Sequence, residues 1–167
     1  MQVEWKDEVN IMDQTDVKIL KCLRADAREN ASLISEKIGM SVSAVIDRIR
    51  KMENNGLIEC HTTIINHRKA GKDVVAILQV ALEHPRYSDD FRATVEQLPE
   101  VLECYFVTGE FDYMIKIITD NTESLELLLH TVKSIPGVHR TLTSVVMSTV
   151  KFEASVDPEQ LTVKSRR

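Results

Sequence analysis

The sequence predicts an α+β protein with two parts. These are an N-terminal winged helix-turn-helix over residues 13–65 and a C-terminal ferredoxin-like βαββαβ domain over residues 73–155. Three observations support this fold class. Residues 13–54 contain three apolar periods of helical spacing, residues 73–152 alternate between strand-like and helical patterns, and residues 66–72 are polar and basic, as in a linker. An N-terminal extension (1–12) and a C-terminal tail (156–167) complete the chain.

The first two helices are predicted from apolar spacing and from capping residues. Asp13 and Thr15 are both suitable N-caps for a helix over residues 14–24, in which apolar side chains recur every three or four positions. A second, shorter apolar period starts at Ala31 and stops at Gly39, because glycine readily adopts the left-handed conformation that ends a helix.

The third helix is the most regular in the sequence. Ser41 is a good N-cap, and the residues that follow it form one apolar stripe at positions i, i+3, i+4, i+7 and i+10: Val42, Val45, Ile46, Ile49 and Met52. The stripe ends at Gly56. Residues 57–65 then alternate and are rich in β-branched side chains, which predicts a strand or short hairpin as a β-wing.

The second part is predicted to be a ferredoxin-like sheet with its helices on one face. Its elements are strand 73–82, helix 88–98, strands 101–107 and 112–119, helix 122–134 and strand 138–152. The short gap between the middle strands predicts a hairpin, and we expect the two helical connections to join parallel neighbours. The other sheet face would expose apolar side chains unless it packs on a second copy, which predicts at least a homodimer.

Charge and composition exclude several classes of protein. A net charge of −5 argues against a protein that coats nucleic acid electrostatically, although it leaves sequence-specific binding open. Residues 13–64 contain eight basic and eight acidic residues, whereas residues 65–167 contain twelve and fifteen. The acidic excess is therefore expected outside the DNA-binding part.

Membrane and metal chemistry are not predicted. The sequence has no run of about 18 apolar residues, and its first ten residues are acidic, unlike a signal peptide, so we expect a cytoplasmic protein. Cys22, Cys60 and Cys104 are too far apart for a zinc motif, and the five histidines lack metal-ligand spacing. We expect no metal and no cofactor.

Residues 32–54 have the parts of a helix-turn-helix, and the outer face of its second helix is the predicted DNA contact. The candidate residues are Ser41, Ser43, Ala44, Asp47, Arg48, Arg50 and Lys51. They offer groups that reach base edges or phosphates in a major groove. A bundle helix with a polar solvent face would look the same. Asp47 would repel phosphate, so we expect it to accept from cytosine or to orient Arg48 or Arg50.

The sequence resembles the Lrp/AsnC, or feast/famine, family of regulators. Four segments carry the resemblance: DQTDVKILKCL (13–23), SVSAVIDRIRKMENNGLI (41–58), VLECYFVTGEFDYMI (101–115) and IPGVHRTLTS (135–144). They cover nearly the whole chain in the family's order. The resemblance implies a domain for double-stranded DNA and a hinge. It also implies an effector domain that forms dimers and often octamers, with a small molecule, commonly an amino acid, bound between dimers.

The resemblance also implies an effector site at the predicted hairpin. A glycine-containing turn can present backbone N–H groups to a carboxylate while Asp112 faces an ammonium group. The candidates are Thr108, Gly109, Glu110, Asp112 and Tyr113, with Thr143, Thr141 and Ser144 on the last strand as second choices. Turn chemistry alone, with a positive φ at Gly109, would explain the same residues.

Two other functions remain open. Haem-biosynthesis decarboxylases acting on sirohaem-derived substrates resemble the same architecture, but their His-Asn-Tyr segment is missing, because residues 103–106 read Glu-Cys-Tyr-Phe. An assembly or sensor protein that no longer binds DNA would also fit the neutral first part and Asp47. Roles for Trp5 in the extension and for the basic residues Lys164, Arg166 and Arg167 in the tail are not decided.

Overall fold

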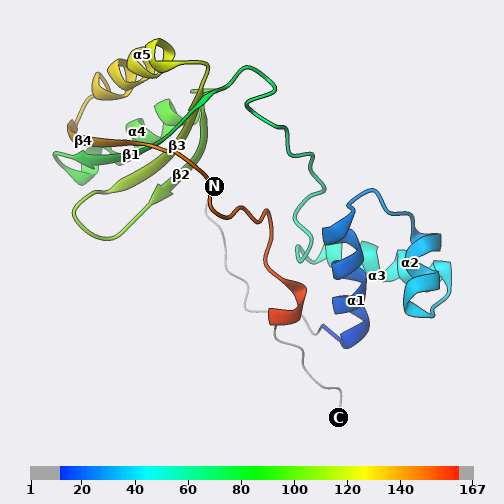
Figure 1. Cartoon of the computed structure of the whole chain (residues 1–167). Helices are drawn as coiled ribbons and strands as arrows, with labels where there is room; N and C mark the ends of the chain where they lie inside the picture. The colour runs from blue at the N-terminus through cyan, green and yellow to red at the C-terminus, as the bar shows by residue number, and fades with distance from the viewer. Residues whose placement is uncertain (1–11, 162–167) are drawn as a thin grey trace. The chain divides into compact units, whose positions relative to one another are not determined.

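The computed structural model describes residues 12–161 of the chain. Trp5 and the basic residues at 164–167 lie outside the described residues. The chain forms two compact units (Figure 1). The first unit holds the described residues up to Thr63 together with the segment from Phe152, and the second unit is Ile64–Lys151.

Three helices form the first unit, as predicted: α1 (Gln14–Ala25), α2 (Ala31–Ile38) and α3 (Val42–Asn54). Asp13 is the N-cap of α1 and Ser41 that of α3, and Gly39 ends α2 with φ 72°. These caps satisfy backbone groups that helix ends leave unpaired. The helices enclose a small core of Ile19, Ile34, Val45 and Met52.

The strand or short hairpin predicted for residues 57–65 is not formed. Residues 57–65 are described throughout and form no strand. Leu57 and Ile58 pack against the three-helix core, and the N–H of Ile58 donates to the carbonyl of Met52 at 3.0 Å. Ile64 and Ile65 are 57% and 72% exposed. A segment with alternating side chains forms a strand only if another strand pairs with it, and no strand among the described residues pairs with this one.

The described part of the C-terminal segment, residues 152–161, groups with the first unit. The last strand was expected to reach Phe152, but β4 ends at Val145. A short 3-10 turn, η2 (Pro158–Gln160), then lies against α1, with Pro158 buried. Three acidic residues of this segment pair with two basic residues of α1: Glu159 with Lys21, and Glu153 (2.6 Å) and Asp157 (3.8 Å) with Arg24.

The second unit has the predicted βαββαβ order. Its elements are β1 (Val74–Leu82), the 3-10 turn η1 (Pro85–Tyr87), α4 (Ser88–Val95), β2 (Val101–Phe106), β3 (Tyr113–Thr119), α5 (Thr122–Lys133) and β4 (Val138–Val145). The sheet order is β2-β3-β1-β4 (Figure 1).

All neighbouring strands of this sheet are antiparallel, which corrects the expected parallel neighbours. Each helical connection joins two strands that run the same way, but another strand lies between them. β3 separates β1 from β2, and β1 separates β3 from β4. The connection alone does not specify this arrangement, because a crossover can skip a strand.

Both helices cover the same face of the sheet. Phe91 and Val95 of α4 share a core with Leu125, Leu128 and Val132 of α5 and with alternate residues of β1 and β3. On the opposite face, one row across the strands is Tyr105, Met114, Gln79 and Leu142. Tyr105 is 53% and Leu142 51% exposed in the single chain. The sheet therefore has one buried face and one face with accessible apolar groups.

Candidate DNA-binding helix and effector hairpin

Helix α3 presents most of the predicted DNA contacts to solvent. Ser43, Asp47, Arg50 and Lys51 are exposed, and Ala44 is half-buried. Ser41 is also exposed, but its hydroxyl accepts the Ala44 N–H at 3.3 Å as the helix N-cap. The exposed face thus combines two cations, a hydroxyl and a carboxylate, which are groups that contact phosphates and base edges in a major groove.

Arg48 differs from the other predicted contacts because its guanidinium binds helix α1. Its Nη1 donates to Asp13 Oδ2 at 2.9 Å and to Asp16 Oδ1 at 2.7 Å. The side chains of Arg48 and Asp13 are 30% exposed, and that of Asp16 only 13%. Asp47 was expected to accept from cytosine or to orient Arg48 or Arg50, and the structure pairs Arg48 with the two aspartates of α1 instead.

The two aspartates also form a capping box at the start of α1. Asp13 accepts the N–H groups of Thr15 and Asp16, while Asp16 accepts the N–H of Asp13. Arg48 therefore joins the recognition helix to a carboxylate pair that is already rigid. The two aspartates are three residues apart in sequence, but Arg48 is more than thirty residues away from each.

Titration of Asp13 reflects this network. Burial alone would raise the pKa of Asp13, but hydrogen bonds from the Asp16 N–H, the Arg48 guanidinium and the Thr15 N–H lower it. The hydrogen bond to Asp16 raises the pKa of Arg48. A carboxyl whose pKa is lowered on folding stabilises the folded state above its ordinary pKa. This contribution is lost as the pH falls through the lowered value.

The predicted hairpin joins β2 to β3, and some of its polar groups form hydrogen bonds that stabilise the hairpin. Gly109 has φ 126°, a conformation that favours glycine. The N–H of Val107 donates to the Asp112 carbonyl at 2.9 Å, and Asp112 Oδ2 accepts the Leu82 N–H at 2.8 Å. One carboxylate oxygen of Asp112 is thus engaged in holding the hairpin against β1.

The structure brings only some of the predicted effector residues together. Thr108, Gly109 and Glu110 are exposed on the hairpin. Tyr113 lies in the core at 1% exposure, where its hydroxyl accepts from Arg92 Nε at 2.9 Å. Thr143 is half-buried on β4 opposite Leu78, so β1 separates it from the hairpin strands.

Two arginines beside the hairpin were missed by the sequence reasoning. Arg140 Nη2 pairs with Glu110 Oε1 at 2.7 Å, and its guanidinium carbon lies 4.6 Å from the centre of the Phe111 ring. Arg92 of α4 contacts Tyr113. Both are distant in sequence from the turn, and only the Arg140 position falls within a segment that carried the family resemblance.

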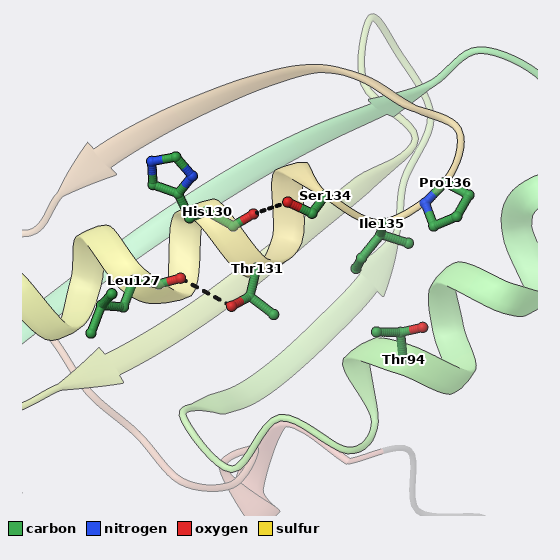
Figure 2. Close-up of a pocket in the computed structure, with 7 residues that line it drawn as sticks. All are labelled: Thr94, Leu127, His130, Thr131, Ser134, Ile135 and Pro136. Carbon is green, nitrogen blue, oxygen red and sulfur yellow. Dashed lines mark hydrogen bonds between the residues drawn. The ribbon is translucent and has the colours of Figure 1, made fainter.

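A hollow of about 600 Å³ lies between α4 and the end of α5 (Figure 2). Its lining residues are Thr94, Leu127, His130, Thr131, Ser134, Ile135 and Pro136. The hydroxyls of Thr94, Thr131 and Ser134 all donate to carbonyls four residues earlier in the chain (2.8, 3.0 and 2.8 Å). None of the predicted effector residues lines this hollow. The three hydroxyl groups that line it already donate to backbone carbonyls of their own helices.

Metal-binding clusters and membrane spans are absent from the described part of the chain. Residues 12–161 contain no group of three or more His, Cys, Asp or Glu side chains that could hold a metal ion. Over the same range, no helix is long and apolar enough to cross a membrane.

Comparison with known protein families gives a match in each unit. Residues 12–59 match the family described as winged helix-turn-helix DNA-binding, and residues 75–156 match the Lrp/AsnC ligand binding domain. A curated relative, the HTH-type transcriptional regulator FL11 of Pyrococcus horikoshii, is 35% identical over 84% of this chain and 92% of its own. The leucine-responsive regulatory protein of Salmonella typhimurium is 31% identical over 93% of both chains.

Solved structures agree with this assignment. A transcriptional regulator from Neisseria meningitidis in complex with L-Met has a TM-score of 0.83 and 27% identity, over 87% of this chain and 96% of that one. A feast or famine regulatory protein from M. tuberculosis complexed with L-methionine has a TM-score of 0.81 and 29% identity, over 87% and 99%. The chain is a member of the Lrp/AsnC family of transcriptional regulators.

Proposed function

We propose that this protein regulates transcription by binding specific DNA through α3, and that an amino acid bound near the β2–β3 hairpin changes this binding. The observation that carries the DNA half is the exposed face of α3, on which Arg50 and Lys51 are accessible while Arg48 is bound to the aspartates of α1. The direct contacts we propose are Ser43, Ala44, Asp47, Arg50 and Lys51, with Ser41 capping the helix.

A dimer is the proposed binding unit. One domain with equal numbers of acidic and basic residues attracts DNA weakly, so two copies of α3 acting on one site would supply the affinity. The accessible row containing Tyr105 and Leu142 supports packing of two sheets face to face. We also propose that dimers assemble into larger oligomers. Light scattering of the full chain measures the oligomer size.

Single alanine variants of Arg50 and Lys51 test the DNA half. Each is expected to weaken binding to DNA upstream of the protein's own coding sequence by about fivefold to tenfold. Each should also reduce the slope of log K against log salt by about 0.9 for every phosphate that the variant no longer neutralises. Fluorescence anisotropy between about 50 and 200 mM salt provides the measurement.

Lys18→Ala is the matched control, because Lys18 is an exposed cation on α1 rather than α3. Its affinity and its salt slope should equal those of the wild type. Absence of any complex at low salt with any duplex would favour a sensor or assembly protein that does not bind DNA. Binding that Arg50→Ala and Lys51→Ala leave unchanged would move the DNA contact away from α3.

An amino acid is the proposed effector because two similar structures are complexes with L-methionine. The exposed hairpin at Thr108–Glu110 offers backbone N–H groups for a carboxylate, and the Asp112 oxygen that does not accept from Leu82 is suited to an ammonium group. The effector changes DNA affinity only if it binds the DNA-bound protein and the DNA-free protein with different affinities. The identity of the effector follows from which amino acid binds most tightly when each is titrated into the protein.

A further inference from the structure

Arg92 on α4 has a guanidinium whose position is fixed by a core residue. Its Nε donates to the Tyr113 hydroxyl at 2.9 Å. Tyr113 is 1% exposed, and the centre of its ring lies 4.6 Å from that of buried Phe91. Most arginine side chains on a surface lose considerable rotamer freedom when they bind a ligand. Arg92 has already lost part of that freedom in the free protein.

The two terminal nitrogens of Arg92 are available. The bond to Tyr113 uses Nε, and within residues 12–161 no carboxylate forms an ion pair with Arg92. The arginines at 24, 48 and 140 each pair with an acidic side chain. Arg92 is thus a cation with a fixed orientation, and no carboxylate of the described residues neutralises it.

An exposed aromatic ring lies beside this cation. The Arg92 guanidinium carbon is 5.5 Å from the centre of the Phe106 ring, which is itself 65% exposed. Phe106 and Tyr113 are register partners on β2 and β3 at the base of the hairpin. The site therefore combines a guanidinium and an apolar surface next to the turn proposed for the effector.

We infer that Arg92 supplies the charged contact to the effector carboxylate, beside the backbone N–H groups of the hairpin, and that Phe106 contacts the effector's apolar side chain. This inference rests on the proposed amino-acid sensing and names the cation that pairs with the carboxylate. A planar guanidinium whose two terminal nitrogens are free matches the two oxygens of one carboxylate, and this bidentate pairing is stronger than a neutral hydrogen bond. A polyanion is a poorer ligand here, because residues 65–167 have more acidic than basic side chains.

Sequence patterns contain no sign of this site. Arg92 is one of several charged residues on the outer face of α4, and none of the segments that carried the family resemblance includes it. Its position over Phe106 arises because α4 packs next to the strand pair that ends in the hairpin. The site is therefore a consequence of tertiary packing between α4 and the sheet.

Titration calorimetry with the full chain tests the inference. Each of the twenty standard L-amino acids is titrated first, and the tightest binder is then compared with its α-amide, which lacks the carboxylate charge. The wild type should bind the acid about 10- to 100-fold more tightly than the amide, as expected for a charge-assisted hydrogen-bonded pair. Arg92→Gln should bind the acid as weakly as the amide, and Arg92→Lys should lie between Gln and wild type.

Arg86→Gln is the matched control. Arg86 also lies over a tyrosine ring (4.8 Å to the Tyr87 centre) and donates to that tyrosine's hydroxyl at 2.8 Å, but it lies on η1. It should preserve the acid-to-amide ratio. A cooperative urea-unfolding transition followed by circular dichroism shows that Arg92→Gln is folded.

The outcomes separate the two proposals. If the wild type binds none of the twenty amino acids, amino-acid sensing is overturned and this inference with it. If it binds one and Arg92→Gln keeps the full acid-to-amide ratio, sensing stands and the role of Arg92 is overturned. A change in oligomer size in Arg92→Gln with an unchanged effector affinity would assign Arg92 to a contact between copies and would also overturn the inference.

Discussion

Arg48→Ala is expected to weaken specific DNA binding by about tenfold without changing the number of phosphate contacts. Arg48 donates to Asp13 and Asp16, so its loss frees α3 to shift against α1 and leaves Asp16 without a cation. Hydrogen bonds to charged groups contribute about 1.5–3 kcal/mol, and partial exposure of this network places the stability loss nearer the lower end. The recognition helix then spends more time out of register with the groove.

The decisive measurement is the salt dependence of affinity, compared between Arg48→Ala and Arg50→Ala. A positioning residue leaves the slope of log K against log salt unchanged, whereas removal of a phosphate-binding residue lowers its magnitude by about 0.9. Asp16→Asn should reproduce part of the Arg48→Ala effect, because Asp13 still accepts from Arg48, and the double variant should be no weaker than Arg48→Ala alone. A lower slope in Arg48→Ala, with additive effects, would make Arg48 a direct DNA contact instead.

Gly137→Ala is expected to lower the unfolding free energy of the effector domain by about 2–5 kcal/mol. This loss is the sum of the penalty for a positive φ at alanine and the cost of overpacking. Gly137 has φ 85°, and a Cβ placed there would lie 2.1 Å from Tyr87 Cγ and 2.6 Å from Tyr87 Cβ. These atoms are close to the Tyr87 backbone, so rotation of the ring tip cannot relieve the clash. The carbonyl of Gly137 also accepts the Glu83 N–H at 2.8 Å, which limits backbone movement.

Gly71→Ala is a matched control for this prediction. Gly71 has a similar φ of 78°, but a Cβ there would meet nothing within 4 Å. Its cost should therefore be only the conformational part, about 1 kcal/mol. Urea unfolding monitored by circular dichroism measures both variants. Equal losses for Gly137→Ala and Gly71→Ala would show that the close packing of Tyr87 on Gly137 does not constrain the domain.

Local patterns predicted the elements of this protein well. Helix starts and ends were readable because their causes are local: Ser41 caps its own helix, and Gly39 adopts the left-handed conformation at the end of α2. The hairpin at Gly109 was predictable for the same reason. The order of strands and helices in the second unit followed from the alternation of two periodicities.

Features that depend on distant partners were not predictable from patterns. The period of α3 places Arg48 on the polar side, but only packing brings it to Asp13 and Asp16 of α1. Tyr113 was predicted in a strand and as an effector contact, yet its side chain is buried and its hydroxyl accepts from Arg92 of α4. Residues 57–65 had strand-like composition without a partner strand, and the antiparallel neighbours reflect crossovers that skip one strand.

Selection of bound duplexes from a random DNA library by the full-length wild type tests most directly whether α3 reads DNA sequence. The protein should enrich a pseudo-palindromic sequence whose half-sites are about 10 base pairs apart, or a multiple of this. Arg50→Ala should lose that enrichment, and the amino acid identified by calorimetry should change the yield of the same sequence. A library that remains random at low salt, with and without the amino acid, would contradict the assignment of α3 as a sequence-specific DNA reader.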